Sequence, residues 1–504
     1  MRLRTYALSV LLLLPAILVA EVKPNTLFSD HMVLQQGVKV PVWGTANEGE
    51  NVIIEFGTQK VSAVTRNGKW LIVLNPLKQG GPFSMKISGE NTVEIKDILV
   101  GEVWICGGQS NMERQLGPRP PQKPILGWEK AVAEAQYPQI REFFVPHITS
   151  PFPLTEIDSK WVVCSPQTVK EFSAVGYFFA RDLHARLKVP VGMIFSSWGG
   201  TPAENWTRKA TLESNPELLT LAQNYDNAMK EYPAKLAGYQ KDEPQLLEKW
   251  KTDTATAKRD KKPLPRKPAP PADPAKSGAA GNMYNAMIAS LQPYAVKGVI
   301  WYQGESNQDR AKQYQTLFPV MINDWRNAWG GNQFPFLFVQ IAPFNGMKPE
   351  IREAQLLSWQ KTPNTAMVVT TDLGDATDIH PANKEPVGAR LALAARALAY
   401  KDKIVYSGPV FKEVKFMDGK ARLKFDFTGS GLISKGGELK GFTIAGNDKV
   451  FVPARAEIKG KQIIVFNDTV TDPKAVRFGW ANAPEVNLFN KEGLPASPFR
   501  TDID

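Results

Sequence analysis

A serine and a histidine, each directly after an apolar run, could together carry out nucleophilic catalysis in this chain. Ser110 lies in VWICGGQSNM, where the glycines allow a tight turn and the serine is either a helix N-cap or a nucleophile. His380 lies in TDLGDATDIHPANK, with Asp378 two residues before it. The other three of the four histidines lie in contexts typical of structural or surface residues: His31, His147 and His184. A general base is therefore sought first at His380.

Two further segments offer hydrogen-bond donors after apolar runs. SSWGGTPAENW contains Gly199 and Gly200, and WYQGESN contains Asn307. Backbone N–H groups of glycine and a side-chain amide can stabilise an oxyanion during acyl transfer. Taken singly, these residues are more typical of turn glycines and of an asparagine helix cap.

Several other chemistries lack their residues. The chain has no phosphate-binding G-x-x-x-x-G-K-[ST], no dinucleotide-binding G-x-G-x-x-G after a strand and no H-E-x-x-H. Its two cysteines, Cys106 and Cys164, form no Cys-x-x-Cys or Cys/His zinc pattern, and either a disulfide or two buried thiols is compatible with their context. The serine motif also differs from the G-x-S-x-G nucleophile elbow, because Met112 replaces the final glycine.

Five apolar runs must position these groups: VGEVWICGG, VPVGMIFSSW, AVKGVIWYQG, FPFLFVQIAPF and TAMVVTTDLG. Amphipathic helical patterns separate them, including one that Ser173 can cap, one after Asn307 and one from about 385 to 400. This alternation predicts an α/β fold with a doubly wound parallel sheet and helices on both faces. Ligand sites in such folds lie beyond the carboxyl ends of the strands.

Different patterns flank this core. Residues 21–97 alternate with period two and predict a small β module, with Asn67 and Gly68 at a hairpin turn. The α/β core is expected over 98–400 and a second β region over 401–504. Between about 212 and 280 the chain is polar and rich in proline and lysine, which predicts a solvated, mobile insertion.

The amino terminus predicts export. Arg2 and Arg4 precede an apolar stretch, and Ala20 offers a small cleavage residue, so residues 1–20 read as a signal peptide and the mature protein as secreted or periplasmic. No later segment is apolar enough to predict a membrane span. The net charge of +11 is concentrated partly in the insertion, and without a nucleic-acid motif it does not predict a nucleic-acid partner.

Together, the motifs resemble a known family. Ser110, Gly199–Gly200, Asn307 and His380 follow the order of the SGNH hydrolases. LFSDHMVLQ, GGQSNM, SSWGGTPAENW, WYQGESN and DIHP closely resemble the bacterial sialate O-acetylesterase family, over about residues 24–485.

The resemblance implies a role for each site residue. Ser110 would be the nucleophile, His380 its base and Asp378 the third triad member, although a Ser–His dyad stays open because position 377, three before the histidine, is threonine. The oxyanion hole would combine the Ser110 N–H, Gly200 and Asn307.

The resemblance also implies supporting residues, no metal or organic cofactor, and an O-acetylated sialic acid or other acetylated glycan as substrate. Substrate-binding or supporting roles are expected for Gln109, Arg114, Gln303 and Glu305. Arg114 would meet a sialate carboxylate or solvate a loop. Sugar stacking or core packing is expected of Trp198, Trp206 and Trp301.

Three alternatives remain. The substrate could be acetylxylan or another neutral glycan. The chain could instead be a non-catalytic glycan-binding protein, although an inactive enzyme would have no reason to keep Ser110, Asn307 and His380 together. A glycosidase would need paired acids, for which the candidates are Glu102, Glu204 and Glu305.

Overall fold

A central sheet of parallel strands forms the core of the computed structural model, which describes residues 21–274 and 279–502. The predicted signal peptide therefore lies outside the described residues. The strand order is β10-β9-β11-β8-β12-β13-β14, with only β10 antiparallel to its neighbour. The strands are β8 (Thr92–Gly108), β9 (Tyr137–Phe144), β10 (Trp161–Cys164), β11 (Val191–Ser197), β12 (Gly298–Tyr302), β13 (Phe336–Val339) and β14 (Thr365–Val368).

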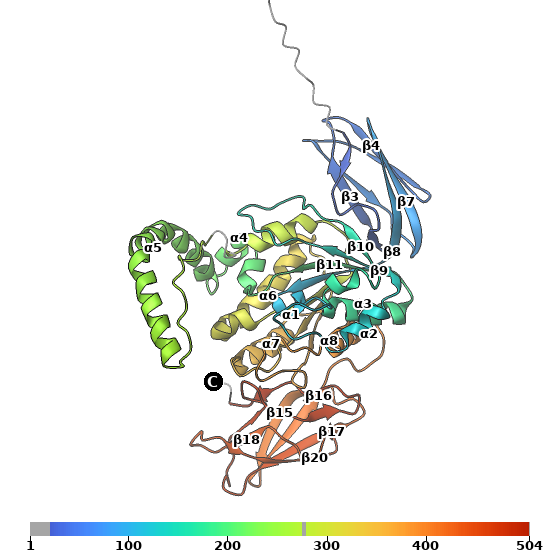
Figure 1. Ribbon diagram of the computed structural model, residues 1–504. Helices are drawn as coiled ribbons and strands as arrows, with labels where there is room; N and C mark the ends of the chain where they lie inside the picture. Colours follow the sequence, from blue (N-terminus) through green and yellow to red (C-terminus); the bar gives the residue numbers. More distant parts are fainter. Residues whose placement is uncertain (1–20, 275–278, 503–504) are drawn as a thin grey trace, which may run out of the picture.

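Helices cover both faces of this sheet, which confirms the predicted α/β architecture (Figure 1). On one face α3 and α8 bury their apolar sides against the strands, and on the other face α6 and α7 do so. Ser173 caps α3, since its Oγ accepts the N–H of Gly176 at 3.1 Å. The helices of the core are α1 (Ser110–Glu113), α2 (Trp128–Ala133), α3 (Ala174–Leu187), α6 (Ala311–Ala328), α7 (Pro349–Lys361) and α8 (Glu385–Leu398).

The amino-terminal β module shares a strand with the core. β8 pairs with β2 and β7 near its start and with β11 and β12 near its end, so the predicted boundary at 97/98 falls inside one continuous strand. The other strands of the module are β1 (Lys23–Pro24), β2 (Val33–Gln35), β3 (Val40–Thr45), β4 (Asn51–Phe56), β5 (Gln59–Val64), β6 (Lys69–Leu74) and β7 (Gly80–Ser88).

The turn at Asn67 and Gly68 forms with positive φ at both residues, 53° and 68°, as expected for a tight hairpin turn. The predicted hairpin is nevertheless incomplete. Only Arg66 and Lys69 pair across the turn, since β5 continues into the sheet of β4 and β6 into the sheet of β3. The turn thus joins the two layers of a sandwich.

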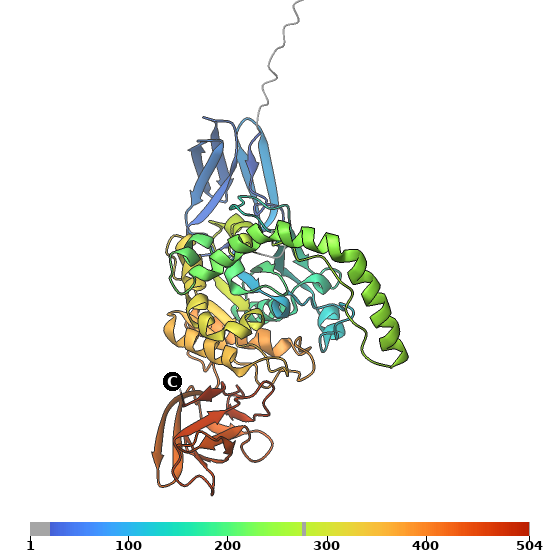
Figure 2. The same cartoon turned by 90° about the vertical axis from the view of Figure 1, so that its left-hand side faces the viewer.

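The described part of the insertion forms a helical arm, which the sequence analysis did not predict, while its mobility stays a prediction. After α4 (Lys209–Glu213), helix α5 (Leu219–Arg259) runs for 41 residues and projects from the core (Figures 1 and 2). The less exposed positions recur at helical spacing and include Tyr225, Tyr232, Tyr239 and Trp250. The proline-rich return segment packs along the arm, where Trp250 Nε1 donates to the Pro265 carbonyl at 3.0 Å. The composition concealed this aromatic stripe among charged residues.

Several short helices lie in the loops around the sheet. They are η1 (Val169–Glu171), η2 (Ala203–Trp206), η3 (Tyr284–Ile288), η4 (Ala289–Leu291) and η5 (Glu305–Arg310).

The carboxyl-terminal β region packs beneath the core (Figure 1) and contacts it through apolar and polar groups. Arg500 pairs with Glu353 of α7 at 2.8 Å, and Gln340 after β13 donates to Ser497 Oγ at 3.0 Å. The strands are β15 (Val410–Met417), β16 (Lys420–Asp426), β17 (Leu432–Ser434), β18 (Phe442–Ala445), β19 (Val452–Pro453), β20 (Arg455–Lys459), β21 (Gln462–Phe466), β22 (Ala475–Phe478), β23 (Leu488–Asn490) and β24 (Phe499–Arg500).

Over the described ranges, no helix combines the length and apolarity that crossing a bilayer requires. Cys106 and Cys164 are separate buried thiols, so they do not form a disulfide.

Candidate active site

Three neighbouring strands deliver the polar residues to one edge of the sheet. β8 lies between β11 and β12, with Gly108 opposite Ser197 on one side and Tyr302 on the other. Parallel strands end at the same edge, so the segments that follow them meet. Ser110 begins α1 after β8, Gly199 and Gly200 follow β11, and Asn307 follows β12.

His380 contacts Ser110 directly. The imidazole Nε2 lies 2.8 Å from the Ser110 Oγ, within hydrogen-bond distance of a general base and a nucleophile. His380 comes from the loop after β14, which is separated from β8 by two strands, so this loop must reach across the sheet edge.

Asn111 holds that loop against the Ser110 segment. Its Nδ2 donates to the Ile379 carbonyl at 3.0 Å and to Glu305 Oε1 at 2.6 Å, while its Oδ1 accepts from Lys384 Nζ at 2.5 Å. Lysine can only donate and the carbonyl can only accept, so these partners fix the orientation of the amide. One buried side chain therefore joins the Ser110, His380 and Glu305 segments.

The buried charges around Asn111 influence the pKa of His380. Burial, followed by the charges of Lys384 and Arg114, lowers the pKa of His380 below its ordinary value, while Asp378 and Glu113 oppose the shift. Burial also lowers the pKa of Lys384 to about 7 and raises that of Glu305. A lowered pKa keeps the His380 imidazole neutral, and thus able to accept a proton, at neutral pH.

Asp378 lies close to His380 but bonds to its backbone. Asp378 Oδ1 accepts the His380 N–H at 2.9 Å, whereas it is 3.9 Å from the imidazole Nδ1. That longer separation permits charge attraction without a direct hydrogen bond. Asp375, five residues before His380, instead pairs with Lys123 at 2.5 Å.

Asn307 presents a fixed amide. Its Oδ1 accepts from the Ala203 N–H at 2.9 Å and from Gln303 Nε2 at 2.7 Å, and its Nδ2 donates to Glu204 Oε2 at 2.9 Å. An amide nitrogen carries two hydrogens, so Nδ2 can donate a second bond to a ligand.

The two candidate glycines differ in their surroundings. The Gly199 N–H already donates to Glu113 Oε2 at 2.5 Å, and a Cβ at Gly199 would lie 3.2 Å from the Cβ of Ser110. Gly200 has φ +76° and open space where a Cβ would be. Gly200 is therefore the less constrained of the two donors.

The two glutamines support the loop between β12 and Asn307. Gln109 Oε1 accepts the N–H groups of Gly304 and Ser306, each at 3.3 Å. Gln303 is fully buried and bonds to Asn307 and to Tyr314, whose hydroxyl lies 3.1 Å from Gln303 Oε1.

Arg114 is buried rather than solvating a loop. It is 1% exposed and its Nη2 donates to the Lys123 carbonyl. Trp206 and Trp301 are also fully buried and meet edge to face, with ring centroids 5.8 Å apart. Neither can stack on a sugar, so of the three tryptophans only the half-buried Trp198 retains that capacity.

Each of the acids considered for a glycosidase is bonded to a neighbouring side chain. Glu102 lies about 20 Å back along β8 from the strand's end, bonded to Gln35 and Gln36. Glu305 bonds to Asn111, and Glu204 pairs with Arg310 at 2.5 Å.

Asn111, Glu113 and Lys384 are the site residues that the sequence analysis missed. Asn111 and Glu113 follow Ser110 within one helical turn, and Lys384 lies four residues after His380. Their closeness in the sequence to Ser110 and His380 was the available signal.

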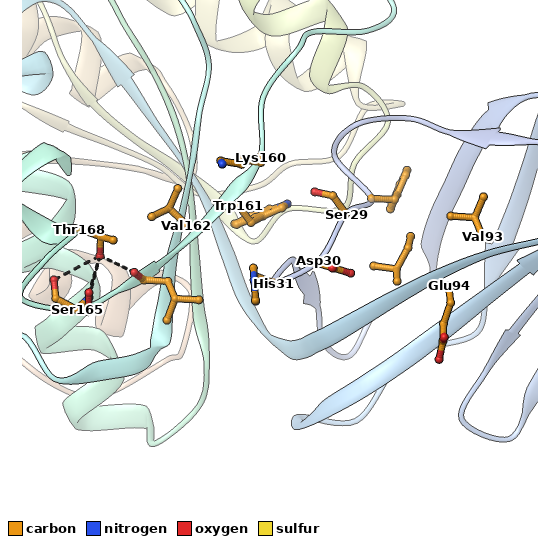
Figure 3. A pocket seen from close by; sticks show the side chains of 13 residues that line it. Ser29, Asp30, His31, Val93, Glu94, Lys160, Trp161, Val162, Ser165 and Thr168 are labelled. Carbon is orange, nitrogen blue, oxygen red and sulfur yellow. Dashed lines mark hydrogen bonds between the residues drawn. The ribbon is translucent and has the colours of Figure 1, made fainter.

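A cavity of about 730 Å³ lies elsewhere, between the β module and the core (Figure 3). Asp30, His31, Lys160 and Trp161 line it. Ile95, also in its wall, is at the opposite end of β8 from Ser110, so this cavity is separate from the Ser110–His380 site.

Comparisons with known proteins agree with this arrangement. Residues 274–397 match the family model of sialic acid-specific acetylesterase carbohydrate esterases. The chain is 30% identical to a sialate O-acetylesterase of Mus musculus, over 94% of this chain and 93% of that protein. The chain belongs to the sialate O-acetylesterase family. A relative of the same name from Homo sapiens is 30% identical over 79% of this chain and 75% of its own length.

A solved structure shows the same fold. The carbohydrate acetylesterase from Xanthomonas citri superposes with a TM-score of 0.81 at 36% identity, covering 96% of this chain and 100% of that one. As a member of the sialate O-acetylesterase family with this fold, the chain is an enzyme that hydrolyses carboxylic esters.

Proposed function

We propose that the protein removes acetyl groups from O-acetylated sialic acids through a serine-bound acetyl intermediate. The single observation that carries the serine mechanism is the 2.8 Å contact between Ser110 Oγ and His380 Nε2. The sialate substrate is supported by the family and by relatives that carry this name.

In the first half of the reaction, Ser110 Oγ attacks the acetyl carbonyl carbon as His380 Nε2 takes the hydroxyl proton. The oxyanion receives hydrogen bonds from the Ser110 N–H, the Gly200 N–H and Asn307 Nδ2. When the tetrahedral adduct collapses, the ester C–O bond breaks and His380 returns the proton to the departing sugar oxygen.

In the second half, His380 takes a proton from water as the water oxygen attacks the acetyl-serine carbonyl. Collapse breaks the bond to Ser110 Oγ, which regains the proton, and acetate leaves. Asp378 attracts the imidazolium that forms in each half. We also propose that the enzyme acts outside the cytoplasm, on the strength of residues 1–20.

Acetate release from three substrates tests the proposal: an O-acetylated sialic acid, acetylxylan and 4-nitrophenyl acetate. Release from the sialic acid well above that from the xylan is the expected result. The reverse order would establish the neutral-glycan alternative, and hydrolysis of the nitrophenyl ester alone would remove the sialate assignment. No release from any of them would favour a binding protein.

A further inference from the structure

A second cavity, of about 650 Å³, adjoins the nucleophile on the side of β9 and β10. Its volume is in the range of pockets that hold small organic ligands. Its wall includes Glu113, Arg119, Phe144, His147, Glu171 and Phe195.

Glu113 connects this cavity to Ser110. It lines the cavity, and its Oε2 accepts the N–H of Gly199, whose Cβ position would lie 3.2 Å from the Cβ of Ser110. Its Oε1 pairs with Arg119 at 2.9 Å. Glu113 therefore links the wall of the cavity to the segment that contacts Ser110.

A run of aromatic rings connects the wall of the cavity to the residue that precedes Gly199. Phe195 stacks on Phe144 at 5.6 Å, Phe144 lies 6.3 Å from His147, and His147 stacks on Trp198 at 4.5 Å with the planes 6° apart. Trp198 directly precedes Gly199, and Phe144 is 42% exposed. Of the four rings, those of Phe144 and His147 are exposed, and the apolar C–H face of a sugar ring gains free energy by packing on an exposed ring.

The charged groups favour hydroxyls over an anion. Glu113 and Glu171 face the cavity with a single arginine, Arg119, which Glu113 already pairs. Glu142 in the wall is buried, its Oε2 has no hydrogen-bond partner among the described residues, and burial raises its pKa, which favours the neutral acid. Carboxyl groups bond readily to sugar hydroxyls but repel a sugar carboxylate.

We propose that this cavity binds a neutral sugar residue adjoining the acetylated one, so that the enzyme prefers acetyl groups on oligosaccharides to those on free sugars. The inference rests on the proposed function, since it assumes an acetylated sugar at Ser110. The acetylated residue lies over Trp198 and Ser110, and its neutral neighbour packs on Phe144.

Phe144→Ala tests this with Phe152→Ala as the matched control, because Phe152 is 74% exposed and is not among the residues of the cavity wall. Acetate release is compared between O-acetylated sialyllactose and the free O-acetylated sialic acid. The wild-type enzyme and Phe152→Ala should favour the trisaccharide, and Phe144→Ala should reduce that preference about tenfold, which corresponds to ~1.4 kcal/mol. If Phe144→Ala slows acetate release equally on both substrates, or slows it on neither, the proposal is overturned.

A binding measurement separates this inference from the catalytic one. Calorimetry of unacetylated sialyllactose with the wild-type enzyme requires no reaction, and Phe144→Ala should weaken the affinity about tenfold while Phe152→Ala does not. If binding depends on Phe144 but no acetylated sugar is hydrolysed, the cavity assignment stands and the proposed function fails. If acetate is released but Phe144→Ala leaves affinity and preference unchanged, the function stands and the cavity assignment fails.

Discussion

Asp378 Oδ1 lies 2.9 Å from the backbone nitrogen of His380 but 3.9 Å from its imidazole Nδ1. The carboxylate therefore fixes the loop that carries the base and acts on the ring through its charge. A triad acid that bonded to Nδ1 would also select the ring tautomer. This geometry favours a Ser–His pair assisted by a nearby charge.

Asp378→Asn should consequently lower kcat roughly tenfold. Where a triad acid sets the tautomer of the imidazole, the expected decrease in kcat is far larger, ~10⁴-fold. The Asp378 charge raises the pKa of His380, so its removal lowers that pKa further and shifts the acid limb of kcat/KM to lower pH. Kinetics of Asp378→Asn and His380→Ala across pH check both expectations. Equal losses in the two variants would support a hydrogen-bonded triad instead.

Lys384→Met should shift the same acid limb to higher pH. The Lys384 charge lowers the pKa of His380, and Lys384, with a pKa of about 7, carries more charge as the pH falls toward the lowered pKa of His380. Removing it raises the pKa of His380, so the base becomes protonated at higher pH. The exposed Lys361→Met serves as control. If the acid limb of kcat/KM does not shift in Lys384→Met, the electrostatic coupling between Lys384 and His380 is contradicted.

Asn307→Ala should lower kcat by about 10²–10³ with a much smaller change in KM, because the lost donor bonds to charge that develops only in the transition state. Steady-state kinetics on a soluble acetyl ester measure this. Asn323→Ala, on the exposed side of α6, is the matched control. A rise in KM at constant kcat would assign Asn307 to ground-state binding.

Asn111→Ala should reduce both activity and stability. The substitution removes the link to Ile379 and leaves Lys384 and Glu305 buried without their shared partner, at a cost of about 1–3 kcal/mol in unfolding free energy. Thermal unfolding and kcat together provide the measurement. Full stability with reduced kcat would show that the buried charges find other partners.

The sequence predicted the parts of the site that depend on strand ends. Ser110, Gly199–Gly200 and Asn307 follow consecutive buried runs, and parallel pairing brings such ends together whatever the intervening loops do. The five runs could be recognised because both faces of their strands are buried.

Contacts made across loops could not be predicted in this way. Lys384 and Asn111 are 273 residues apart, and no local pattern reveals that a lysine there will be buried. The same applies to Arg114, whose burial depends on packing of the 115–125 segment. In α5 the tyrosines recur at helical spacing, but the charged residues between them hid the stripe.

Ser110→Ala tests the central claim most directly. Acetate release by the purified wild-type and variant enzymes should differ by at least ~10³ in kcat, with unchanged thermal unfolding. An acetyl-serine intermediate also predicts that intact-protein mass spectrometry of the quenched wild-type enzyme finds an added acetyl group at Ser110. Near-full activity of Ser110→Ala would contradict the account and require a different nucleophile.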